Sequence, residues 1–193
     1  MSLETSVALA EVCRTRQEPH HAAPVLHTAP MSLLCEYFMA PSTDAAASVL
    51  DWTGGPAHPP GGKRSLLRRS QPAPAAYEVV SLPGVEPTVT VGQLDALLTG
   101  RSITDVIHDT DRKPIASADG GERMVIPLGP RFEDAIAAIR NDEVPELARQ
   151  WSQAEEFWGQ GDPEVLADGV QELASLVRRG RERQEHLYCW VCV

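Results

Sequence analysis

The stretch LYCWVCV, residues 187–193, decides the fold of this chain. Its aromatic and β-branched residues form a short apolar run, which predicts a buried strand. An unpaired apolar strand at the end of a chain would aggregate, so we expect this one to pair inside a sheet. Residues 33–40 are also rich in aromatic and apolar side chains, stop at Pro41 and predict a second strand. We expect the two strands to lie side by side.

The terminal strand carries the motif Cys189-x-x-Cys192. A redox pair of this kind owes its low thiol pKa to a helix N-terminus, and no residue follows Val193 to form one. On an extended strand, residues 189 and 192 also point to opposite faces. We therefore expect these thiols to pack, without a metal or a cofactor. A thiol or metal site that uses Cys35, Cys189 and Cys192 is the alternative, although zinc would need further ligands.

The rest of the chain predicts short helices and strands. Helices are expected at residues 44–51, 91–98 and 132–139 and from Pro163 onward, strands at 77–82 and 123–128, and a polar turn at 109–120. The helix after Asp162 is the clearest, because Asp162 suits its N-cap and Pro163 its first position. Its apolar stripe is formed by Leu166, Val170, Leu173 and Val177. Another helical pattern links Leu147, Trp151, Ala154 and Trp158 and ends at Gly159.

These patterns predict one α+β domain over residues 31–193. We expect a small mixed sheet that contains both apolar strands and is covered by helices from the last third of the chain. Residues 1–30 predict a flexible extension. Met-Ser-Leu occurs both at position 1 and at position 31, and no helical pattern continues through QEPHHAAP at residues 17–24. Residues 53–76 are rich in proline and glycine and predict a disordered insertion.

The chain is acidic, with 27 acidic and 17 basic side chains and a net charge of −10. The whole excess falls on residues 77–193, which hold twenty-one acidic and eleven basic side chains. A surface of that sign repels phosphate backbones, so we expect no nucleic acid, whereas a basic protein partner fits. The basic cluster KRSLLRR, residues 63–69, predicts a solvated loop, with a docking patch for an acidic partner as the alternative.

The sequence favours the cytoplasm. No apolar run is long enough to span a membrane. Residues 1–30 lack the basic start and continuous apolar region of a secretory signal. Four cysteines without such a signal indicate reduced thiols.

Five residues are candidates for a ligand site: Trp52, His108, Trp151, Glu155 and Trp158. His108 precedes Asp109, which suits a general base oriented by a carboxylate, although a surface histidine in a turn has the same pattern. Neighbours on a helix diverge by about 100°, so Glu155 and Glu156 cannot form a glycosidase pair alone. The tryptophans suit either the core or a pocket. Motifs for a nucleophile elbow, a dinucleotide loop or a P-loop do not occur.

The order of these patterns resembles the YfbM-like family of small bacterial proteins. The resemblance rests on CEYF at residues 35–38 followed by APS, on LLTG at residues 97–100, on Gly-Gly-Glu at 120–122 and on a final helix and strand over 162–193. The insertion at 53–76 and the terminal CWVC depart from that pattern. The resemblance implies a single α+β domain and a bacterial source. It brings no established activity, so no catalytic residue is carried over.

The sequence as a whole favours a non-catalytic binding or interaction module, for example an inhibitor of a basic partner. No convergent catalytic set is evident, and the acidic surface suits such a partner. The alternative is a small-molecule enzyme or ligand binder with one pocket near Trp52, His108, Trp151 and Trp158.

Overall fold

The computed structural model describes residues 33–60 and 75–193. The predicted extension at 1–30 and the basic cluster at 63–69 lie outside the described residues. Five strands form one sheet in the order β2-β1-β5-β4-β3. They are β1 (Leu34–Ala40), β2 (Val79–Ser81), β3 (Ala116–Ala118), β4 (Arg123–Pro127) and β5 (His186–Cys192). The α+β class is confirmed, and all four pairings are antiparallel where a mixed sheet was predicted.

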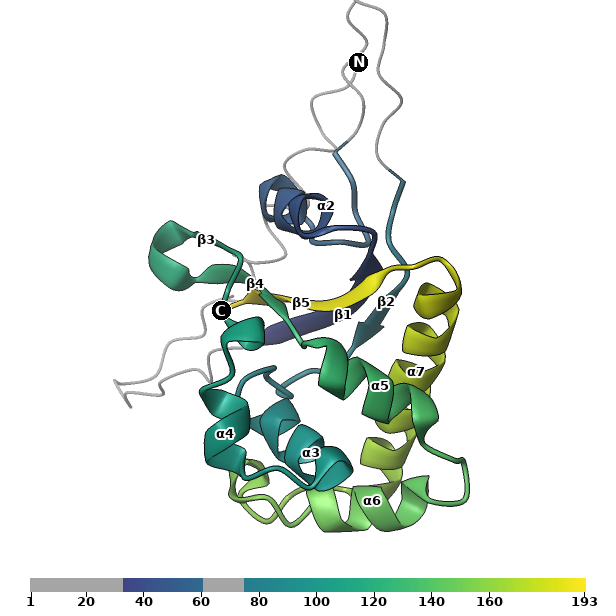
Figure 1. Ribbon diagram of the computed structural model, residues 1–193. Helices are drawn as coiled ribbons and strands as arrows, with labels where there is room; N and C mark the ends of the chain where they lie inside the picture. Colours follow the sequence, from purple (N-terminus) through teal and green to yellow (C-terminus); the bar gives the residue numbers. More distant parts are fainter. Residues whose placement is uncertain (1–32, 61–74) are drawn as a thin grey trace, which may run out of the picture.

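The two apolar strands lie side by side at the centre of the sheet, as predicted (Figure 1). β1 and β5 pair along their whole length, with Leu34 opposite Cys192 and Ala40 opposite His186. Because side chains alternate along a strand, each of the two strands supplies both faces of the sheet. Tyr37 and Cys189 therefore belong to one face and Phe38 and Tyr188 to the other.

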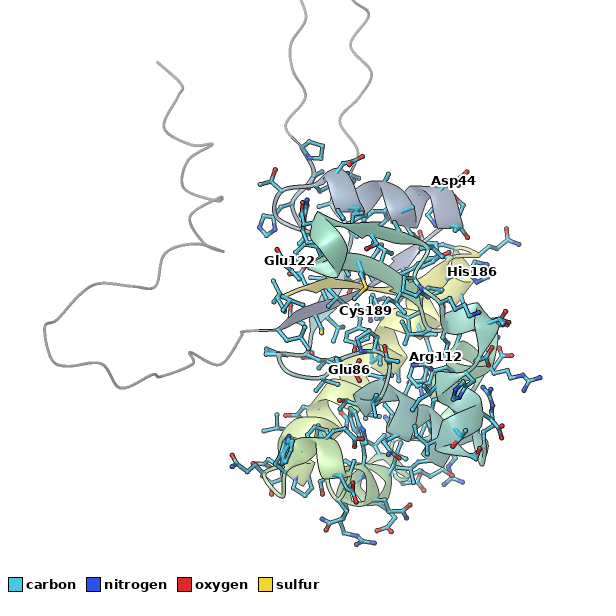
Figure 2. All side chains as sticks on the ribbon, turned by 90° about the vertical axis from the view of Figure 1, so that its left-hand side faces the viewer. Asp44, Glu86, Arg112, Glu122, His186 and Cys189 are labelled. Atoms are coloured by element: carbon cyan, nitrogen blue, oxygen red, sulfur yellow. The ribbon has the colours of Figure 1, made fainter. Side chains whose placement is uncertain are left out.

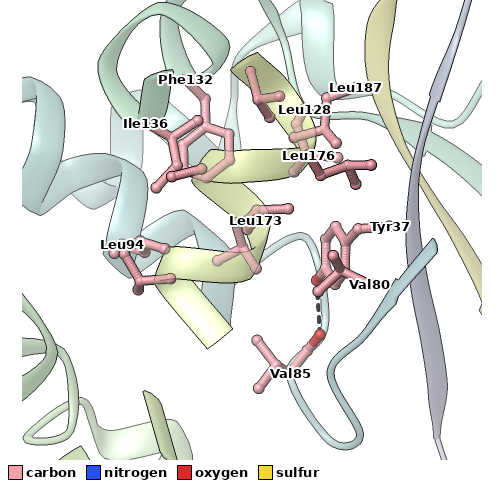
Figure 3. Close-up of a cluster of buried hydrophobic side chains, with 14 of the residues drawn as sticks. Tyr37, Val80, Val85, Leu94, Leu128, Phe132, Ile136, Leu173, Leu176 and Leu187 are labelled. Carbon is pink, nitrogen blue, oxygen red and sulfur yellow. Dashed lines mark hydrogen bonds between the residues drawn. The ribbon is translucent and has the colours of Figure 1, made fainter. Parts of the chain in front are cut away.

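Helices cover one face of the sheet (Figure 1). They are α3 (Thr90–Thr99), α4 (Ile103–Ile107), α5 (Pro130–Ala138), α6 (Val144–Trp151) and α7 (Pro163–Glu182). The main core lies between these helices and the sheet, where Tyr37 of β1 and apolar side chains of α5 and α7 belong to one cluster of buried residues (Figure 3). The predicted stripe of α7 is confirmed, since Leu166, Val170, Leu173 and Val177 are all buried.

The opposite face is covered by a shorter segment, α2 (Thr43–Ala47) and a 3-10 turn at Ser48–Asp51. Figure 2 shows Asp44 of α2 on this side and Arg112 on the side of the larger helices. A second core forms here around Phe38, Trp52 and Trp190. The insertion predicted at 53–76 begins on this face with turns at 53–60, in which Gly55 and Pro56 are buried, and residues 61–74 lie outside the described part.

Two local predictions were wrong. The region 109–120 contains β3, because pairing with β4 recruits Ala116–Ala118, although these residues show no strand pattern of their own. The helix predicted through Trp158 ends at Trp151 as α6, and a 3-10 turn follows at Glu155–Phe157. Trp158 then adopts a left-handed conformation (φ 53°), and the residue is 87% exposed. Among the described residues, no helix has the length and apolarity that a membrane span needs.

Candidate functional site

The five predicted site residues do not share a pocket. Trp52 is buried in the core on the α2 side of the sheet, whereas Trp151 is buried in the core on the α7 side. The indole N–H of Trp151 donates to the Thr90 carbonyl (2.8 Å), which fixes this ring as a core element. The sheet therefore lies between the two tryptophans.

The other three candidates are exposed. His108 is the C-cap residue of α4 and hydrogen-bonds through Nδ1 to the Thr104 carbonyl (2.8 Å), as a surface histidine does. Glu155 and Trp158 are exposed in and after the short turn that follows α6. None of the described contacts joins His108 to Trp52 or Trp151.

Cys189 and Cys192 lie on opposite faces of the sheet, as the geometry of a strand predicts. Cys189 is fully buried in the main core together with Cys35, whereas Cys192 packs against the second core. Burial raises the pKa of the Cys189 thiol well above its ordinary value, and the nearby Cys35 raises it further. A thiol in this environment stays protonated and unreactive. Within residues 33–60 and 75–193, no three histidine, cysteine or acidic side chains are grouped as metal ligands.

A buried carboxyl group lies on the α2 face. Glu36 faces Trp190 across β1 and β5, and each is less than a tenth exposed. Glu36 Oε2 and Trp190 Nε1 are both buried without a hydrogen-bond partner among the described residues. Burial raises the pKa of Glu36, and nearby His58 partly offsets this. Gly55 covers the pair so closely that an added Cβ would lie 2.8 Å from Glu36 Oε2.

A groove runs along α7, which we call the α7 groove. It consists of three adjoining cavities between α7 and the chain around β2. Its first part, the apolar section, is a cavity of about 230 Å³ between the turn after β2 and the first turns of α7. Its lining residues include Leu82, Val85, Trp151, Val165, Asp168 and Glu172.

The groove continues past the edge of the sheet. The middle part, the edge section, is about 450 Å³ and is lined by Val79 and Val80 of β2 and by Glu172, Ser175 and Arg179 of α7. The last part, the arginine section, is about 500 Å³ and is lined by residues that include Tyr77, Glu78, Arg183 and Glu185. Glu172 lines both the apolar and the edge sections, and Glu78 lines both the edge and the arginine sections, so each section adjoins the next.

Charge is distributed unevenly along the α7 groove. In the last two sections, Arg179 pairs with Glu78 (2.5 Å) and Arg183 with Glu185 (2.7 Å). In the apolar section, Asp168 and Glu172 have no ion-pair partner among the described residues, and both are exposed. The apolar section therefore has a negative rim that no cation of the described chain neutralises.

Sequence reasoning missed the α7 groove, although one feature of α7 pointed to it. Val165 lies on the polar side of an otherwise regular amphipathic helix and is 65% exposed. Val165, Asp168, Glu172, Ser175 and Arg179 follow helical spacing and line the groove as one stripe. The facing wall comes from residues 78–85, far away in the sequence, so no local pattern predicts the pairing.

Comparison with protein families, with curated proteins and with solved structures finds no match to this chain. The resemblance to the YfbM-like family therefore stays a prediction. The geometry of the α7 groove is the basis for a functional assignment.

Proposed function

We propose that the protein is a non-catalytic binding module that holds a basic, partly apolar segment of a partner protein in the α7 groove. One observation carries this proposal: the apolar section is bordered by two carboxylates, Asp168 and Glu172, that have no cationic partner in the described chain. Membership in the YfbM-like family, a bacterial source and a cytoplasmic location belong to the same proposal and rest on the sequence.

The apolar section provides the binding energy. Val165 is largely exposed while Leu82 is only partly buried beside it. Covering apolar side chains of this size contributes about 1.5–3 kcal/mol for each one that becomes fully buried. An aliphatic side chain of a partner gains in the same way.

The carboxylates provide selectivity. Lysine or arginine residues on either side of the inserted aliphatic residue would lie against Asp168 and Glu172. Complementary charge of this kind accelerates association and discriminates against acidic partners. Because the rim is exposed, salt weakens the attraction.

The proposal is tested with the synthetic octapeptide Ser-Lys-Ser-Leu-Ser-Lys-Ser-Leu, in which lysine and leucine share one face of an extended chain, titrated into the full chain by calorimetry. We expect binding that weakens at high salt. The double variant D168N/E172Q should bind at least tenfold more weakly, while E164Q, an exposed change on the same helix outside the lining of the groove, should bind like the wild type. A control peptide with glutamate in place of lysine should not bind. Equal affinity of D168N/E172Q and the wild type would overturn the proposal.

No observation favours the alternative of a small-molecule site. Such a site needs Trp52 and Trp151 in one pocket, and the sheet lies between these residues. The binding module is therefore the function that the geometry supports best.

A further inference from the structure

We propose that the partner segment binds in extended form and adds a strand to the edge of the sheet at β2, along the α7 groove. This inference rests on the proposed function and specifies how the segment is held. It follows from three properties of the described chain: a sheet edge with unused hydrogen-bonding groups, a groove that runs along that edge, and a charge pattern that suits one kind of strand.

The first property is the edge itself. β2 is the outermost strand on its side of the sheet and pairs with β1. The Leu82 N–H donates to the Cys35 carbonyl (3.1 Å), and hydrogen-bonded pairs alternate along an antiparallel ladder. Val80 therefore bonds to Tyr37, and the backbone groups of Val79 and Ser81 point away from β1. Among the described residues, no backbone partner accepts from or donates to these outward groups.

The second property is the alignment of the groove with this edge. The edge section lies between Val79 and Val80 on one side and α7 on the other. The apolar section continues from Ser81 onward, and the arginine section begins before β2 at Tyr77 and Glu78. A helix rises about 1.5 Å per residue, so the stretch from Val165 to Arg183 is about 27 Å long. An extended chain of about eight residues has the same length.

The third property is charge. A strand in this position directs alternate side chains toward α7. At the apolar section these side chains meet Val165, Asp168 and Glu172, which suit an aliphatic residue with basic residues two positions before and after it. Farther along the groove, Glu78 and Arg179 neutralise each other, so no charged side chain of the partner is required there. The preferred occupant is an extended segment whose basic and aliphatic residues are concentrated at one end.

A short edge strand also protects the free protein. β2 has three residues, an exposed Glu78 before it and Pro83 shortly after it. Shortness, charge and proline are the features that prevent edge-to-edge aggregation. Strand addition then requires side chains that complement the groove, which makes the recognition selective.

The test uses the lysine-leucine octapeptide and two derivatives. In one, the backbone nitrogens of all lysines and leucines are methylated, and in the other those of all serines. An added strand uses the N–H groups of every second residue, so one derivative should lose at least tenfold in affinity and the other should bind within threefold of the parent peptide. If both derivatives bind like the parent, or both lose affinity equally, strand addition is overturned while the binding module stands. If the parent peptide itself does not bind, the proposed function fails.

Amide hydrogen exchange gives an independent measurement. On saturation with the peptide, the amides of Val79 and Ser81 should exchange at least tenfold more slowly, since they become donors or lie beside the new strand. The amide of Val80, which already bonds to β1, should change little. Protection confined to the Val80 amide or to α7 would overturn the proposal.

Two other occupants of the edge are distinguished by further measurements. A dimer that the peptide dissociates, seen by sedimentation over a range of protein concentrations, would assign the edge to a second copy of the chain. The variant K63S/R64S/R68S/R69S should bind the peptide with unchanged affinity. Binding at least tenfold tighter in this variant would assign the groove to the basic segment of the chain itself. Either result would overturn the assignment to a partner.

Discussion

Arg112 and Asp95 form an ion pair inside the protein, with Nη1 2.6 Å from Oδ2 and both side chains at most 5% exposed. Arg112 also donates to the Pro87 carbonyl (2.5 Å) and lies over the ring of Phe132, 5.8 Å from its centre. Arg112 thereby joins Asp95 of α3 to the turn that precedes α3, which contains Pro87. That turn includes Val85, which accepts a hydrogen bond from the Tyr37 hydroxyl (2.7 Å) and lines the apolar section.

Removing one member of this pair should strongly destabilise the fold. In R112M, Asp95 keeps a buried charge without its partner and the Pro87 carbonyl loses its donor. Breaking a buried pair in this way costs about 3–5 kcal/mol. The matched control R140M breaks the exposed pair with Asp142 and should change the free energy of unfolding by at most about 1 kcal/mol. Urea unfolding of both variants checks the difference, and a similar loss in both would contradict a structural role for the Arg112 pair.

The close packing of α7 on the sheet depends on Gly180. A Cβ at this position would lie 2.5 Å from Met39 Cγ. G180A should therefore lower the free energy of unfolding by about 1–3 kcal/mol, because the strain of overpacking exceeds the gain in helix propensity. Met39→Ala removes Cγ and Cε and leaves the Cβ of residue 39, 2.9 Å from the added Cβ. G180A should therefore cost less in an M39A background, although part of its cost should remain, when measured by urea unfolding.

G169A is the control for this effect. A Cβ there would meet Leu82 Cδ2 at 3.0 Å, and this atom is the tip of a partly exposed side chain that can move. G169A should leave stability within about 1 kcal/mol of the wild type. If G180A is no more destabilising than G169A, the contact with Met39 does not limit how closely α7 packs.

Much of this framework was predictable because it depends on local chemistry. Ser42 Oγ accepts from the Ala45 N–H, Asp162 accepts from the Glu164 N–H, and Gly100 ends α3 in a left-handed conformation (φ 68°). The strands β1 and β5 were predictable because their apolar runs have no other way to be buried.

The remaining features depend on contacts between distant segments. β3 exists because β4 supplies its hydrogen bonds, and its sequence Ala-Ser-Ala has no preference of its own for a strand. Trp158 has helical spacing to Trp151, yet the chain turns at Ala154 before it reaches that position. The α7 groove needs Leu82 and Val85 opposite Val165, and this juxtaposition is set by the tertiary fold alone.

The described thiols should differ in reactivity. Cys35 and Cys189 are fully buried, while Cys192 is half-buried. In a C13S background, which removes the cysteine outside the described residues, Cys192 should react with a disulfide reagent at least tenfold faster than the other two. Denaturant should equalise the three rates. Fast native reaction of Cys189, lost in C189S, would contradict the packing role of its thiol and favour a thiol site.

The buried Glu36 should make the stability of the protein depend on pH. Burial raises the pKa of Glu36 above the value of about 4.3 expected in the unfolded chain. Folding therefore favours the protonated form of Glu36. The stability that protonated Glu36 contributes is fully present at a pH below its pKa in the unfolded chain, and it is lost as the pH rises through its pKa in the folded protein. Glu36→Gln keeps a neutral side chain at every pH. The free energy of unfolding of E36Q minus that of the wild type should therefore be larger at pH 7 than at pH 4, as measured by urea unfolding.

The comparison with E36Q isolates Glu36 from other titrating groups. Burial also raises the pKa of Glu133, but Glu133 is present in both proteins, so its effect cancels in the difference. E122Q removes one carboxylate from an exposed position and serves as the control for the change in net charge. If E36Q and E122Q differ from the wild type by the same amount at pH 4 and at pH 7, Glu36 is hydrated in solution and Gly55 does not cover it. Movement of the turn at residues 53–58 away from β1 would be the structural reason for such a result.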